Sequence, residues 1–213
     1  MYHKVELEDV SDECSDDTKL CAKKITINEK LSIEKLVSLQ IDYIKDHCTN
    51  EHNAGQEESA TVGDGGAATA GDYGDATAGC CGVAMVGHCG SSTTGAHGVA
   101  IAGDNGVSKA GDVGLATAGY CGIAMTENDG VAKAGKLGVA TSRGHSSVGE
   151  NGVAFARGND VMVKGELGAI IFIVEEQDLT YDIREWKAGV IDGKTLKPNT
   201  WYKLENGEFV ECE

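Results

Sequence analysis

The sequence predicts an all-β protein, a β-solenoid (parallel β-helix or β-roll) of octapeptide repeats with a small N-terminal α/β cap and a C-terminal β-hairpin domain. Three observations lead to this fold class: a repeat of eight residues, the regular placement of glycine in it, and an alternation of side chains between the glycines. The 213 residues include 30 Gly, a single Pro and only 5% aromatic residues. A core of large side chains is therefore not expected.

The repeat has the form G-x-x-G-x-A-x-A. It runs from residue 55 to residue 142, is interrupted by the six residues RGHSSV, and resumes from residue 149 to residue 172. Of its 14 octads, 12 have Gly at the first position and 12 have Gly at the fourth. Self-similarity at a fixed period indicates a solenoid, in which each repeat buries its apolar face against its neighbours. We therefore expect three regions: residues 1–54, the solenoid 55–172 and residues 173–213.

The spacing of the glycines predicts corners and strands. Glycine disfavours helix and supplies a positive φ at no steric cost, as tight corners need. The last four positions of each octad can then form a short strand, whose side chains alternate between two faces. One face carries Ala at the sixth position, and the other carries larger residues at the fifth: Val83, Val99, Val107, Leu115, Ile123, Val131 and Val139.

Two features of the coil stay open at this level. A coil of three octads would place Thr69, Thr93, Thr117 and Thr141 in one file, which favours a three-sided solenoid over a two-sided one. Either face of the strands can point inward. Alanine inward gives a thin rod, and valine inward gives a wider rod with a flat alanine face.

Residues 1–54 have a different composition. A strand is expected at residues 24–27, and Ser32 is placed to cap a helix with one apolar face. That face, which would cover the first coil or dock a partner, consists of Ile33, Leu36, Val37, Ile41 and Ile44. The acidic stretch at residues 7–17 is expected to be mobile.

Residues 173–213 predict alternating strands and a hairpin across Asn206-Gly207. Both tryptophans lie here, so a compact aromatic core can form. The region is interpreted as a cap on the last coil or as a small binding domain. For the binding interpretation, the candidate partner-binding residues are Trp186, Trp201 and Tyr202.

Candidate chemistry is confined to the corners. The second and third octad positions hold the cysteines and histidines that neighbouring coils could bring together: Cys80, Cys81, His88, Cys89, His97 and Cys121. Their spacing is not a standard one for zinc, so packed thiols are expected and metal binding by Cys80, Cys81, Cys89 and Cys121 is left open. We assign no catalytic residue, no metal site and no cofactor. The corner acids are expected to be solvated turn residues.

The net charge of −16 disfavours direct binding to nucleic acid or to an anionic membrane. No apolar run reaches the ~18 residues that a membrane span needs. The acidic N-terminus does not resemble a secretory signal. The expected location is the cytoplasm, that of the host cell if the protein is phage-encoded, or a phage particle.

The octads resemble three groups of repeats. They are similar to half of the sixteen-residue repeat of bacterial ice-nucleation proteins, but Ala stands at most positions where those proteins have Thr. They are also similar to the head repeats of trimeric adhesins. The octads followed by DGKTLKPNTWYKLENGEFVE resemble uncharacterised octapeptide-repeat proteins of gut bacteria and their phages over residues 55–213. This resemblance implies an architecture and no activity.

The sequence therefore predicts a non-enzymatic structural or interaction protein. A rigid solenoid would present its end domains to a protein partner, with homo-oligomerisation as an option. The alternative is an acidic, rod-shaped inhibitor that mimics nucleic acid and occupies a host or defence enzyme. Ice or crystal binding is the third hypothesis, weakened by the missing Thr array.

Overall fold

The computed structural model describes residues 2–10, 22–31, 51–177 and 180–212. It divides into two units, Met1–Asp46 and His47–Glu213. The first unit contains an antiparallel pair of strands, β1 (Tyr2–Val10) and β2 (Ala22–Leu31). The strand expected at residues 24–27 lies within β2. Residues 7–10 of the stretch expected to be mobile belong to β1. The helix expected after Ser32 lies outside the described residues.

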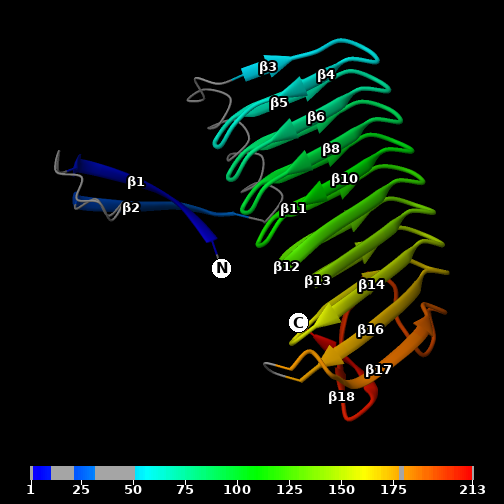
Figure 1. The fold of residues 1–213 in the computed structure, drawn as a ribbon. Helices are drawn as coiled ribbons and strands as arrows, with labels where there is room; N and C mark the ends of the chain where they lie inside the picture. Colours follow the sequence, from blue (N-terminus) through cyan, green and yellow to red (C-terminus); the bar gives the residue numbers. More distant parts are fainter. Residues whose placement is uncertain (1, 11–21, 32–50, 178–179, 213) are drawn as a thin grey trace. The chain divides into compact units, whose positions relative to one another are not determined.

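The second unit is the solenoid, whose strands stack in chain order (Figure 1). Sheet I consists of β3 (Glu51–Asn53), β5 (Ala67–Ala70), β7 (Val83–Val86), β9 (Val99–Ala102), β11 (Leu115–Ala118), the second halves of β12 (Ile123–Ala134) and β13 (Val139–Val148), and β15 (Met162–Gly165). Sheet II consists of β4 (Ser59–Thr61), β6 (Asp75–Ala78), β8 (Ser91–Thr94), β10 (Val107–Ala110), the first halves of β12 and β13, β14 (Val153–Gly158) and β16 (Ile170–Glu176). All these pairings are parallel.

One coil contains two octads, so the preference for a three-sided coil was wrong. Val83 pairs with Val99, and Asp75 pairs with Ser91, in each case 16 residues further on. The threonines that suggested one file alternate between the sheets: Thr69 and Thr117 lie in sheet I, while Thr93 and Thr141 lie in sheet II. A threonine that recurs in every third octad keeps the same position within the octad, and successive threonines alternate between the two sheets. This recurrence therefore carries no information about the coil size.

The six-residue interruption fits the coil without a corner. Val131 pairs with His145, and Val139 pairs with Val153, so this coil is two residues shorter. The long strand β13 runs through residues 143–148 and crosses from sheet II to sheet I. The segment therefore replaces an octad and does not end the solenoid.

Alanine faces inward. The sixth-position side chains Ala68, Ala84, Ala100, Ala116 and Ala132 are fully buried. Serine replaces alanine at Ser92, Ser108 and Ser146, which are buried too. Up to β14 the interior is thus filled by small side chains of both sheets, and the larger fifth- and seventh-position residues point outward. In the last two octads this direction is reversed, because the fifth- and seventh-position residues Val161, Val163, Ala169 and Ile171 are the buried ones.

The octad glycines have a different role from the one expected. In most octads the left-handed residue of the corner is the third-position residue, and it is usually a non-glycine: Glu57, Tyr73, Cys81, Cys89, His97, Asn105, Val113, Cys121, Asp129, Leu137 and Asn151, with φ from 52° to 59°. In the last two octads it is the fourth-position residue, Asp160 and Gly168. This conformation turns the backbone N–H toward the next coil. Tyr73 N donates to His88 O at 2.8 Å, and Val113 N donates to Asn128 O at 2.8 Å.

Glycine is required because neighbouring backbones nearly touch. A Cβ at Gly114 would lie 2.7 Å from Ala110 Cβ and 3.1 Å from the carbonyl oxygen of Gly98, one coil earlier. At Gly103, a first-position glycine, a Cβ would lie 2.8 Å from the Gly87 carbonyl oxygen. Any side chain at these positions would push the coils apart.

The parallel stack ends in antiparallel strands. On sheet II, β17 (Ile183–Val190) pairs with β16; on sheet I, β18 (Trp201–Glu205) pairs with β15. The expected hairpin across Asn206-Gly207 is present, since β18 pairs with β19 (Glu208–Cys212). Within the described part of the chain, no helix is long and apolar enough for a membrane crossing.

These corners predict that Val113→Asn stabilises the protein. A β-branched residue is strained at φ 54°, whereas asparagine tolerates this region, as Asn105 and Asn151 do at the same octad position. Val113 is more than half exposed, so little packing is lost. We expect the free energy of unfolding in urea to rise by about 1 kcal/mol. A decrease would contradict the strain.

The adjacent substitution Gly114→Ala has the opposite expected effect. Its Cβ would overlap the preceding turn and the previous coil, and overpacking of this kind costs about 1–3 kcal/mol. Gly55→Ala is the matched control. It belongs to the first octad, and its Cβ would come within 3.4 Å of the flexible Glu58 side chain alone. Equal unfolding free energies for the two variants would refute the close-approach explanation.

Candidate interaction surface

The cysteines and histidines of the corners lie along two opposite edges of the solenoid. His88, Cys89 and Cys121 lie on the edge that leads into sheet II, called edge A; Cys80, Cys81 and His97 lie on the edge that leads into sheet I, called edge B. The structure therefore does not bring the six residues together. Among the residues that it describes, no three His, Cys, Asp or Glu side chains are grouped closely enough to hold a metal ion.

Second-position aspartates connect successive coils, a role that the expectation of solvated turn residues missed. The Oδ1 atoms of Asp64, Asp72 and Asp104 each accept the backbone N–H of the residue 16 positions later at 2.7 Å. Asp112 accepts the N–H of Asn128 at 3.0 Å. The recurrence of Asp at this octad position was the available signal, but only the coil size shows which N–H it reaches.

The three candidate partner-binding residues differ in environment. Tyr202 is buried, accepts the Lys197 N–H at its hydroxyl at 2.6 Å and packs against Phe209. Trp201 is partly buried between Lys164, whose Nζ lies 4.8 Å from the ring centroid, and His145. Trp186 on β17 is 66% exposed. Partner binding by these residues stays a prediction, and Trp186 is the one whose ring is open to solvent.

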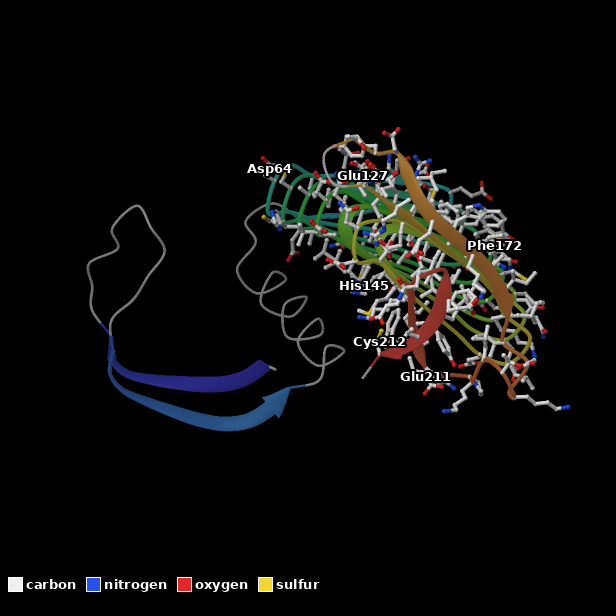
Figure 2. All side chains as sticks on the ribbon, turned by 90° about the horizontal axis from the view of Figure 1, so that it is seen from below. Asp64, Glu127, His145, Phe172, Glu211 and Cys212 are labelled. Carbon is white, nitrogen blue, oxygen red and sulfur yellow. The ribbon has the colours of Figure 1, made fainter. Side chains whose placement is uncertain are left out.

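Trp186 belongs to a larger apolar surface on the outside of sheet II. Strand register aligns Val139, Val153, Ile170 and Val190 in one column, and Thr141, Phe155, Phe172 and Ala188 in the next. Trp186 pairs with Val174 in a third. We call this surface the apolar face; it comprises Val107, Ile123, Met125, Val139, Thr141, Val153, Phe155, Ile170, Phe172, Val174, Trp186, Ala188 and Val190. Figure 2 places Phe172 and His145, which is on sheet I, on opposite sides of the solenoid.

Several side chains of the apolar face are open to solvent. Ile123 and Ile170 are each 39% exposed and Val190 is 53% exposed. Leu137 and Leu167, on the third position of edge A, extend the apolar surface at its border and are also exposed. The corresponding outward residues Val83 and Val99 of sheet I are buried. The accessible apolar surface is therefore on sheet II.

Ion pairs border the apolar face on the side of edge B. Arg143 Nη2 and Arg157 Nε each donate to Glu176 at 2.5 Å, and Glu176 is almost completely buried. The hydrogen bond from Arg143 is the main cause that holds the pKa of Glu176 below its usual value. Lys109, which pairs with Met125 and therefore lies in the second column and not at the border, has its Nζ 3.6 Å from Glu127 Oε1. These three cations thus have carboxylate partners.

A charged hollow of about 510 Å³ lies beside the last coil and includes Glu175, Arg184, Lys203 and Glu205. Burial raises the pKa of Glu175, and Arg184 opposes this shift. Arg184 lies 3.5 Å from Glu175, and Lys203 lies 2.7 Å from Glu205. Both cations of the hollow thus lie beside a carboxylate, and four carboxylates, those of Asp160, Glu175, Glu185 and Glu205, line it in all.

Asp192 holds the segment that positions β17. Its Oδ1 accepts the backbone N–H groups of Lys194, Thr195 and Leu196 at 2.8, 2.7 and 3.1 Å. These bonds lower the pKa of Asp192 to about 2. The turn places Leu196 against Gly189 of β17, where a Cβ would lie 2.8 Å from Leu196 Cδ1.

Comparisons of the chain with protein-family models, with curated proteins and with solved structures found no match. The interpretation of the apolar face therefore rests on its geometry and chemistry.

We expect Asp192→Ala to destabilise the C-terminal strands in a pH-dependent way. Because the folded-state pKa is lowered from 3.8 to about 2, the stabilisation by the carboxylate is complete above pH 4 and is lost as the pH falls toward 2. The difference in unfolding free energy between wild type and variant should shrink over that interval. Asp75→Ala, which removes an exposed carboxylate on β6, is the control. A pH-independent difference for Asp192→Ala would contradict the assignment.

Proposed function

We propose that this protein is a non-enzymatic structural or interaction protein whose solenoid holds the apolar face ready to bind another protein. The observation that carries the proposal is an uncharged array of Val, Ile, Phe and Trp side chains on the outside of sheet II, open to solvent at Ile123, Ile170, Trp186 and Val190. Apolar patches of more than a few hundred Å² on a protein surface mark interaction sites.

The solenoid suits this role because its backbone is tied together coil by coil. Parallel ladders run through both sheets, and further backbone hydrogen bonds connect the corners. A surface presented on such a frame loses little conformational entropy on binding. Residues of the last coils and of β17 are held in one register, so a partner meets a preformed face.

The corner aspartates give less support to an acidic rod that mimics nucleic acid. Asp72 and Asp104 lie on edge A, whereas Asp64 and Asp112 lie on edge B, and the Oδ1 atom of each already accepts a backbone N–H. A mimic would need rows of free carboxylates along one surface. The location in a cytoplasm or in a phage particle remains part of the proposal.

Photocrosslinking in cells that express the protein tests this function. A benzophenone amino acid at position 186 is expected to capture a protein, and the product should persist at high salt because apolar contacts are not screened. The same probe at Thr77, which is exposed on β6 of the same sheet outside the apolar face, should capture nothing. Absence of a product at position 186 would refute the proposal. A product lost at high salt would favour the acidic inhibitor.

A further inference from the structure

The apolar face is long, flat and regular enough to meet a matching sheet. It crosses six strands in register: β10, β12, β13, β14, β16 and β17. Neighbouring strands are ~4.8 Å apart and alternate side chains ~6.8 Å apart, so the side chains of the apolar face give a footprint on the order of 400 Å². Two such faces in contact would bury about 850 Å², the size of a weak, concentration-dependent interface.

The charges restrict what can cover this face. The chain carries a net charge of −16, so two copies repel each other over most of their surface. The side chains of the apolar face are uncharged, although Lys109 lies in the column of Met125 and Arg157 lies in the column of Val174. Lys109 is paired with Glu127, and Arg143 and Arg157 are paired with Glu176. A strongly charged partner would find no complementary groups there. An uncharged surface of the same shape is the best complement.

A second copy provides that shape by identity. Two sheets that pack face to face interdigitate their side chains with nearly aligned strands. The strand repeat of one copy equals that of the other, so the ridges formed by Val139, Val153 and Ile170 can match grooves of the partner along the whole face. Phe155 and Phe172, whose ring centroids are 6.5 Å apart, lie near the centre of this array.

We propose that the occupant of the apolar face is a second copy of this chain, in a symmetric dimer with sheet II of one copy packed against sheet II of the other. This inference rests on the proposed function, because it names the partner of the same surface. The dimer buries Ile170, Trp186 and Val190 of both copies and leaves the two edges accessible.

Sedimentation velocity of the purified full-length chain over a range of concentrations tests the dimer. The wild type is expected to dimerise. Ile170→Asp and, separately, Trp186→Glu should weaken the dimer by about 30-fold or more, because each places like charges in the interface. Thr77→Asp adds the same charge to β6 and should leave the dimer intact.

Thermal unfolding of each variant separates lost association from lost folding. Trp186 is mostly exposed in one copy, so its replacement should leave the fold of the chain unchanged. A wild type that stays monomeric at all concentrations would overturn the proposal, as would variants that dimerise normally. If the wild type is monomeric but the probe at position 186 captures a different protein, self-association is refuted while the proposed function stands. If neither dimer nor capture is found, both fail.

Discussion

Neighbouring coils of the solenoid approach so closely that their backbones are in contact at most corners, and the remaining features of the structure depend on this approach. Most glycines at the first and fourth octad positions have no room for a Cβ, which at Gly90 would lie 2.7 Å from the Gly74 carbonyl oxygen. In most octads the corner therefore turns at the third residue, whose left-handed backbone conformation directs its N–H to the next coil. Tight stacking thus requires two glycines and one residue with a positive φ in most octads.

This stacking separates the interior from the surface. Inside, through most of the stack, the two sheets are so close that Ala and Ser suffice to fill the space, and at the last coil Val163, Ile171 and Ile173 fill it instead. Outside, the fifth and seventh positions are free to differ between coils without disturbing the ladders. The frame can therefore carry polar residues such as Asp75 and Thr77 at one end of sheet II and an apolar array at the other. The antiparallel β17 and β18 extend both sheets and end the parallel stack.

The surface chemistry follows from this division. Apolar side chains accumulate on the outside of sheet II toward β17, and the buried carboxylate of Glu176 accepts hydrogen bonds from both Arg143 and Arg157 beside them. We propose that this surface binds a flat, uncharged partner. Because the frame is rigid, the side chains of the six strands are already held in place, and association costs little conformational entropy.

Much of this protein was determined by its sequence alone: the β-solenoid, the corners, the strand at every octad and the C-terminal hairpin follow from a period of eight and from local turn preferences at residues such as Asn206-Gly207. The coil size, the inward direction of alanine and the composition of the apolar face were decided only by the tertiary structure. An even repeat preserves strand parity for any number of octads per coil, so the sequence does not show that Ile123, Val139 and Val153 share one column. Ile170 joins this column because the last two octads are shifted by one position against the strands before them. Nor does it distinguish a glycine needed for positive φ from one needed for close approach, because that difference lies in the neighbouring coil.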